Sequence, residues 1–225
     1  MKLVIAALLV LPSTAIAAPS AAEIRASQKL ERAILPCMGE GAASDAGTPV
    51  KVPGVSVNGF VQSVMRWTDA GGEHLAVFWV RDTIQDQTAC KVQSRHMQVD
   101  VYDVKSGKPN LARSVKETAT TCHEDSRARF DDDITVDDVD GDGSGELTFS
   151  YTTGCLPMFE AARPVPRKLL VLEGQDKHIL RGETAVKENG KLRGGTFTPE
   201  GFQKQDALLA AAKQAWRKLA DADPR

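Results

Sequence analysis

Apolar and polar residues alternate through most of the middle of the chain, which is the pattern of half-buried β-strands. It predicts strands at residues 60–68 and 74–81, joined by a hairpin turn at Asp69-Ala-Gly-Gly72. Residues 75–80 are apolar on both faces, so we expect this strand at the centre of its sheet. Further strands are predicted around Met97, Val99 and Val101, at residues 111–118, 130–136, 147–152, 168–172 and 178–181, and in a hairpin around Asn189-Gly190.

Helical patterns flank this β-rich middle. Ser20-Ala-Ala-Glu23 is a capping box, which predicts a helix that ends before Pro36 and carries Ile24, Leu30, Ala33 and Ile34. A second helix is predicted to begin at Thr198-Pro199-Glu200, with one apolar stripe formed by Leu208, Ala212, Ala215, Trp216 and Leu219. The order of helix, many strands and helix predicts an α+β domain, a mostly antiparallel β-sheet flanked by N-terminal and C-terminal helices.

The first 17 residues have the three-part pattern of a secretory signal peptide. Lys2 precedes an apolar run at residues 3–11, and a small-residue site follows at Ala15-Ile16-Ala17. The run is too short to span a bilayer. Cleavage after Ala17 would leave roughly 200 residues, enough for one sizeable core. We therefore expect residues 18–225 to form a single exported, soluble domain, periplasmic or secreted, without a membrane anchor.

Export gives the cysteines a structural meaning. Cys37, Cys90, Cys122 and Cys155 are an even set in an oxidising compartment, which predicts two disulfides among three possible pairings. The chain has no Cys-x-x-Cys, which argues against a redox motif, and no His–Cys spacing typical of zinc. Cys122 and Cys155 lie on either side of an acidic stretch and would meet if its flanks run antiparallel. The preferred pairing is Cys122–Cys155 with Cys37–Cys90.

The candidate chemistry is in that acidic stretch, Asp138-Val-Asp140-Gly-Asp142-Gly143-Ser144-Gly-Glu146. Acids occupy loop positions 1, 3, 5 and 9, and the glycine at position 6 permits a sharp bend. This spacing suits calcium, which takes about six to eight oxygen ligands. The predicted ligands are the side chains of Asp138, Asp140, Asp142 and Glu146 and the carbonyl of Ser144.

The loop is not a complete EF-hand, because position 12 is Phe149 rather than an acid. It runs directly into the strand predicted at residues 147–152, with Glu146 at the junction. The alternative is a solvated Asp-Gly turn that binds nothing, since both residues favour tight turns. Repulsion among the clustered carboxylates favours the metal site over this alternative.

Ile134 to Cys155 resembles a segment of an uncharacterised family of exported bacterial proteins. Its members have one Asp-rich loop of the FG-GAP or VCBS type, then a strand, a cysteine, a proline-bearing loop and a Lys-Leu…Glu-Gly…Arg-Gly segment, which here would be residues 168–174 and 180–182. The similarity extends from about residue 60 to residue 183. Some members are labelled surface-polysaccharide proteins, so the resemblance implies an envelope or surface-glycan partner.

The charge and the remaining motifs exclude several functions and assign no catalytic residue. A net charge of −2 with dispersed basic residues gives no nucleic-acid patch and no polybasic membrane signal. A Gly-x-Ser-x-Gly elbow fails because Asp142 stands at a required glycine, and His123-Glu124 lacks a second zincin histidine. Residues 131–133, three aspartates, are read as a solvated face, and Trp67 and Trp79 as core.

Two functions remain open, and no catalytic residue is assigned. The favoured one is an exported, non-enzymatic module with a structural calcium loop and an envelope or surface-glycan partner. The other is an envelope glycan hydrolase that uses acidic residues as acid and base, since the separation of two carboxylates in space is not visible in a sequence.

Overall fold

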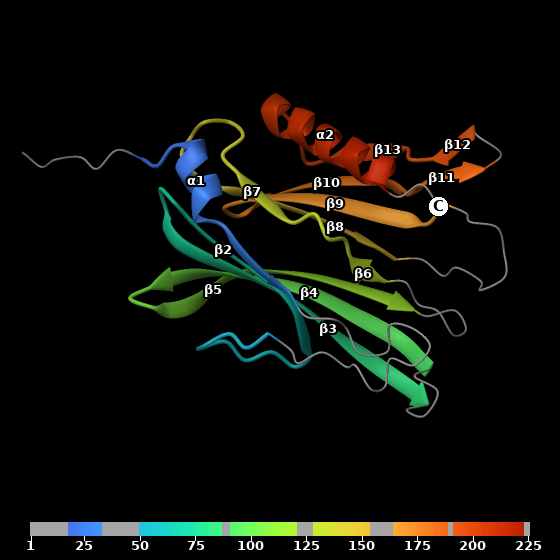
Figure 1. Ribbon diagram of the computed structural model, residues 1–225, viewed down its shortest axis with the longest axis horizontal. Helices are drawn as coiled ribbons and strands as arrows, with labels where there is room; N and C mark the ends of the chain where they lie inside the picture. The colour runs from blue at the N-terminus through green and yellow to red at the C-terminus, as the bar shows by residue number, and fades with distance from the viewer. Residues whose placement is uncertain are drawn as a thin grey trace, which may run out of the picture.

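Two antiparallel sheets packed face to face form the body of the protein (Figure 1). The computed structural model describes residues 18–32, 50–86, 91–120, 128–153, 164–188 and 191–222. The mostly antiparallel α+β prediction is confirmed, but the described strands divide among two large sheets and one two-stranded hairpin instead of a single sheet. The predicted signal peptide, residues 1–17, lies outside the described residues, as do Cys37, Cys90, Cys122 and Cys155.

The first sheet has the strand order β1-β2-β3-β4-β5. Its strands are β1 (Lys29–Arg32), β2 (Phe60–Asp69), β3 (Gly72–Asp86), β4 (Lys91–Lys105) and β5 (Lys108–Thr120). Residues 75–80 of β3 are all buried, because one face meets the second sheet and the other is covered by residues 50–57. The central position predicted for this strand is therefore confirmed. The β2–β3 turn closes at the pair Asp69 and Gly72, also as predicted.

The second sheet has the order β13-β10-β9-β8-β6, and β7 also pairs with β8. Its strands are β6 (Arg129–Phe130), β7 (Thr135–Asp137), β8 (Glu146–Thr152), β9 (Pro166–Glu173), β10 (Asp176–Glu183) and β13 (Phe197–Glu200). The single strand predicted at residues 130–136 is thus two short strands with a break between them. A separate hairpin pairs β11 (Ala185–Glu188) with β12 (Lys191–Gly194), which confirms the pairing predicted around residues 189–190.

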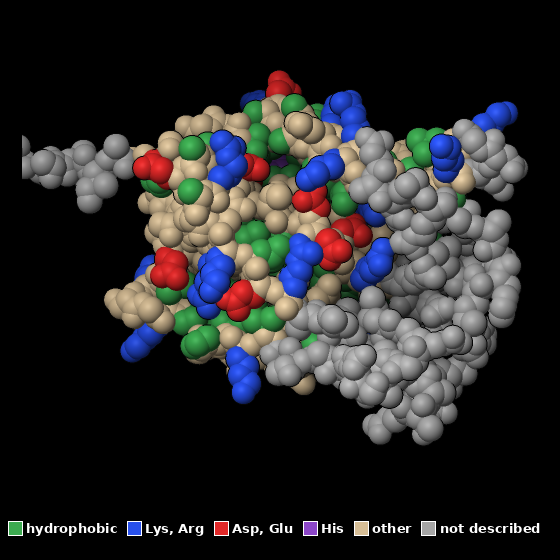
Figure 2. Space-filling model, in the orientation of Figure 1, with side chains coloured by type: hydrophobic (Ala, Val, Ile, Leu, Met, Phe, Trp, Pro, Cys, Tyr) green, Lys and Arg blue, Asp and Glu red, His purple; other side chains and the backbone are tan. Residues whose placement is uncertain are grey.

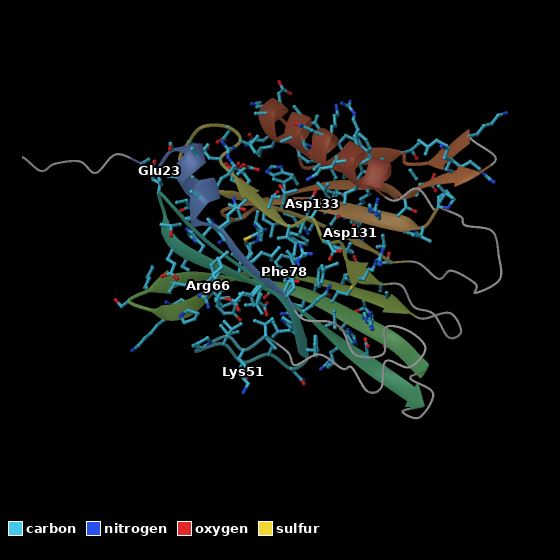
Figure 3. All side chains as sticks on the ribbon, viewed as in Figure 1. Glu23, Lys51, Arg66, Phe78, Asp131 and Asp133 are labelled. Carbon is cyan, nitrogen blue, oxygen red and sulfur yellow. The ribbon has the colours of Figure 1, made fainter. Side chains whose placement is uncertain are left out.

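Aromatic side chains fill the space between the sheets. Phe78 of β3, labelled in Figure 3, makes edge-to-face contacts with Phe130 and Phe149 of the second sheet, each at 5.3 Å between ring centroids. Such pairs contribute about 0.5–1.5 kcal/mol each beyond their buried area. The core is therefore shared by both sheets, and neither sheet could bury its inner face alone.

Helix α1 (Ala21–Ser27) begins at the predicted capping box, with the Ser20 and Glu23 side chains each bonded to the other residue's amide. It is shorter than predicted. Gln28 takes an extended conformation, and the next four residues pair with β2 as β1, with Leu30 opposite Met65. The predicted continuation through Ala33 and Ile34 lies outside the described residues.

Helix α2 (Asp206–Ala222) covers the outer face of the second sheet (Figure 1). The predicted stripe is confirmed, because Leu208, Ala212 and Trp216 are buried against this face, with Ala215 and Leu219 partly buried beside them. The predicted start at residues 198–200 is wrong, since these residues form β13 along the edge of β10. No helix of the described segments is long and apolar enough to cross a membrane.

Candidate metal centre

The acidic loop, residues 138–145, closes the hairpin between β7 and β8 and lies close to α1 (Figure 1). Asp137 pairs with Glu146 at its base, so Glu146 begins β8 as the sequence predicts. Gly143, at position 6, has a φ of 88°, a conformation that strains residues with a side chain. A Cβ there would also lie 2.9 Å from the Cβ of Ala18. Both facts explain why the bend uses glycine.

The loop brings four of the predicted ligands together. One carboxylate oxygen from each of Asp138, Asp140, Asp142 and Glu146 lies within 4.8 Å of the others, so this group could hold a metal ion. Asp140 and Asp142 are exposed, whereas Glu146 is completely buried. The cluster therefore has a solvent-facing mouth and a buried base. Ser144, the predicted carbonyl ligand, is partly buried and donates its amide to Asp142 Oδ1 at 2.7 Å.

The aspartates also shape the loop through their own hydrogen bonds. Asp138 Oδ1 accepts from the Gly141 amide at 2.8 Å, and Asp140 Oδ1 accepts from the Asp142 amide at 3.2 Å. Short side-chain-to-backbone bonds of this kind are common in Asp-Gly turns without any metal. The loop geometry alone is thus compatible with the solvated-turn alternative.

The environment of Glu146 favours a metal site over a solvated Asp-Gly turn. Its Oε2 accepts from the Val139 amide at 2.6 Å, but its Oε1 is buried and has no hydrogen-bond partner. Burial, together with the charges of Asp140, Glu173 and Asp138, raises the pKa of Glu146 to about 8 although the Val139 bond lowers it. An unpartnered buried carboxylate oxygen is costly unless a cation pairs with it. The donor set is all oxygen, which fits a hard cation.

Glu173 is a fifth acid at the cluster that sequence analysis missed. It ends β9, one residue beyond the pair Leu147 and Leu172, so it lies across from Glu146. Its Oε2 is also buried without a hydrogen-bond partner. Burial and the charges of Asp140 and Asp142 raise the pKa of Glu173. No spacing in the sequence links this residue to the loop, because the strand register alone brings it there.

His178 lies beside Glu173, with its Nε2 3.8 Å from Glu173 Oε2. Its Nδ1 is 2.6 Å from the Gly201 carbonyl oxygen, which can only accept, so Nδ1 carries the proton. Its Nε2 is buried without a hydrogen-bond partner. Three neighbouring strands, β8, β9 and β10, therefore each direct one unpartnered buried polar atom toward this end of the second sheet.

Asp69, expected only as a turn residue, joins the loop to the first sheet. Its Oδ2 accepts from the Gly145 amide at 3.0 Å, and its Oδ1 accepts from the Gly71 amide at 2.7 Å and contacts His74 Nε2 at 2.8 Å. Burial opposes ionisation, but the bonds to His74 and Gly145 hold the pKa of Asp69 below its usual value. The Ala70 amide adds a bond to the Gly143 carbonyl at 2.9 Å. The β2–β3 turn thus holds the acidic loop from the opposite sheet.

The three consecutive aspartates are not simply a solvated face. Asp131 is buried and lies 3.2 Å from Arg167, while Asp133 pairs with Lys218 of α2 at 2.9 Å. Both aspartates are labelled in Figure 3. Only Asp132 is exposed, and it pairs with Arg32 at 2.9 Å. Acidic and basic side chains are interspersed on the face shown in Figure 2, outside the grey atoms. The aspartates therefore serve as ion-pair partners between elements.

Trp67 and Trp79 are buried, as expected for core residues.

Comparisons of the chain with protein-family models, with curated proteins and with solved structures found no match.

Proposed function

We propose that this chain is an exported β-sandwich protein whose loop at residues 138–146 binds one calcium ion as a structural element. The observation that carries the proposal is the buried, unpartnered Oε1 of Glu146 at the base of a carboxylate cluster. A cation there would pair with this oxygen and relieve the repulsion among the four acids.

The chemistry of the ligands favours calcium over other common metals. The cluster offers carboxylate oxygens, and Ser144 can add its carbonyl, whereas zinc prefers nitrogen and sulfur ligands in tetrahedral sites. Magnesium requires a near-ideal octahedron, which a loop with two exposed aspartates does not impose. The exposed mouth leaves room for the water molecules that commonly complete a calcium shell.

An ion in the loop would stabilise the junction of the two sheets. The loop belongs to the β7–β8 hairpin of the second sheet, and Asp69 and Ala70 of the first sheet bond to it. A ligand that binds only the folded state stabilises it by about 2.7 kcal/mol at a hundredfold excess over its Kd. Order in the loop would therefore hold this end of the sandwich closed.

The structure favours a binding role over glycan hydrolysis. A hydrolase needs an accessible carboxylic acid with a raised pKa. Glu146 and Glu173 have raised pKa values. Glu146 is completely buried, and the side chain of Glu173 is only 17% exposed with its Oε2 buried, so neither is placed to protonate a glycosidic oxygen. Asp69 and Asp131 are tied to His74 and Arg167. The surface-glycan partner implied by the resemblance is compatible with a binding module and is proposed here on that basis only.

Calorimetry tests the calcium proposal. The chain from Ala18 onward, first stripped with chelator, should bind calcium with a Kd of about 10⁻⁴–10⁻³ M, as extracellular modules do. Asp140→Ala should abolish the binding heat. Asp132→Ala is the matched control, because Asp132 is an exposed aspartate outside the cluster. Equal heats from the wild type and Asp140→Ala, or none from the wild type, would refute the proposal.

A further inference from the structure

A pocket of about 260 Å³ opens between the two sheets at the end where the metal loop meets the β2–β3 turn. Its walls come from that turn, from β4 and β5, from residues 144–145 of the loop and from the β9–β10 turn. It does not include the four clustered carboxylates, so it is a separate feature. Connecting turns from both sheets meet here, which is where binding sites on rigid scaffolds commonly lie.

The charged groups of the pocket neutralise one another. His74 lies between two carboxylates, with Nε2 2.8 Å from Asp69 and Nδ1 3.2 Å from Asp103. Burial lowers the pKa of His74, but the bond to Asp69 and the charges of Asp69 and Asp103 outweigh this effect and raise it. Arg113 donates to the carbonyls of Gly174 at 3.0 Å and Asp176 at 2.7 Å. Both ring nitrogens of His74 face carboxylates, which only accept hydrogen bonds, so this geometry favours the protonated imidazole. With His74 protonated, it and Arg113 balance the charges of Asp69 and Asp103, and the pocket suits a neutral ligand.

The floor of the pocket is apolar and its rim is polar. Val101, Leu147 and Leu172 form part of the lining and are buried, which gives one apolar surface. The rim includes the exposed Gln175 and the Asp103 carboxylate, whose side chain is 45% exposed. Amide and carboxylate groups exchange hydrogen bonds with hydroxyls. A ligand that matches both parts has one apolar face and a hydroxyl-bearing edge.

We propose that this pocket binds one neutral sugar residue, as a free monosaccharide or as the end of a glycan. A sugar ring combines an apolar face of C–H groups with equatorial hydroxyls, and it carries no charge. The volume is below the range of about 300–1,000 Å³ typical of pockets for drug-sized ligands, which limits the occupant to a single ring. The exposed rim at Gln175 would allow the rest of a chain to extend into solvent.

Backbone amide chemical shifts test this inference, with the protein saturated with calcium. Glucose, galactose, mannose and N-acetylglucosamine are the neutral probes, glucuronate and glucosamine the charged ones, and a disaccharide distinguishes a free sugar from a glycan end. At least one neutral sugar should give saturable shifts at Gly71, Ser144 and Gly174, with a Kd on the order of 1 mM for so small a ligand.

Two variants and a control locate the site. Ala112→Trp should fill the pocket and abolish the shifts, whereas Leu111→Trp, at the preceding and 58% exposed position, should leave them unchanged. Gln175→Ala changes only an exposed rim residue and should weaken sugar binding several-fold. It provides a second test of the site if Ala112→Trp does not fold. No saturable shift with any neutral sugar, tighter binding of a charged sugar, or full binding by both variants would overturn the inference. The calcium proposal is decided by the separate calorimetry.

Discussion

Glu146→Gln should change stability in opposite directions with and without calcium. The glutamine keeps the shape of the side chain and an oxygen for the Val139 amide, but it cannot ionise. Its amide nitrogen would replace the unpartnered Oε1 with a donor near the Asp138 and Asp140 carboxylates. The metal-free protein should therefore become more stable, whereas the calcium-bound state loses a ligand.

The size of the effect follows from the pKa of Glu146. In the metal-free protein this pKa rises from an ordinary 4.5 to about 8, mainly because of burial. Because the folded pKa is raised, the stability contributed by the protonated group is present below about pH 4.5 and is lost as the pH rises toward about 8. Each pH unit costs about 1.4 kcal/mol, so the loss at pH 7 reaches roughly 3 kcal/mol as an upper value.

Thermal unfolding in chelator and in saturating calcium provides the assay. In chelator at pH 7, Glu146→Gln should raise the Tm by up to roughly 6–12 °C for a domain of this size, and the two proteins should converge near pH 4.5. On going from chelator to saturating calcium, the Tm of the wild type should rise more than the Tm of the variant. Glu31→Gln, at a partly exposed glutamate outside the cluster, controls for the loss of one acid. A variant that is destabilised equally in chelator and in calcium would refute this reasoning.

Three further outcomes are expected from neighbouring residues. Asp69→Asn should weaken calcium binding and lower stability by about 1–3 kcal/mol, because it impairs the bond to Gly145. The control Asp103→Asn removes only the second carboxylate beside His74 and should leave calcium binding unchanged. Equal calcium affinities of the two variants would contradict this prediction. Glu173→Gln should weaken calcium binding roughly tenfold in calorimetry, as changes to groups around metal ligands do. Asp176→Asn, at the exposed residue paired with Glu173, should leave calcium binding unchanged. Equal losses of affinity in both variants would indicate only a through-space charge effect. Mass mapping without reductant should find Cys122–Cys155 and Cys37–Cys90, and free thiols or a Cys90–Cys122 peptide would contradict this prediction.

Most strands could be predicted because alternation of apolar and polar residues is a local property. Alternation shows that one face is buried but does not show what covers it, so the division into two sheets was not visible. The errors lie where a local signal was overridden by pairing. Leu30 fits a helical stripe, yet it pairs with β2, and Thr198-Pro199 opens many helices, yet here it lies along the edge of β10. Pro199 is tolerated there because β13 is an edge strand.

The candidate site likewise contains residues that the sequence predicts and residues that only the folded structure brings there. Asp138, Asp140, Asp142 and Glu146 are close in sequence, so their spacing alone predicts that their side chains converge. Glu173 reaches the cluster only through the register of β9 against β8. Asp69 reaches the loop only because the two sheets pack face to face, a contact between residues that are 76 positions apart. No local pattern carries these two contacts.

The position of Glu146 would allow a loop without an acid at position 12 to enclose an ion. In an EF-hand that acid comes from the helix that follows the loop. Here the chain enters a strand instead, and the first residue of that strand, Glu146, is already buried at the base of the cluster. Its backbone is paired with Asp137, which places the buried acid beside the other carboxylates of the cluster. The metal-free protein must then protonate Glu146 or leave its charge unpaired, and either choice costs stability at neutral pH. A loop anchored to a sheet in this way would make the proposed calcium ion part of the folded structure rather than a reversible signal.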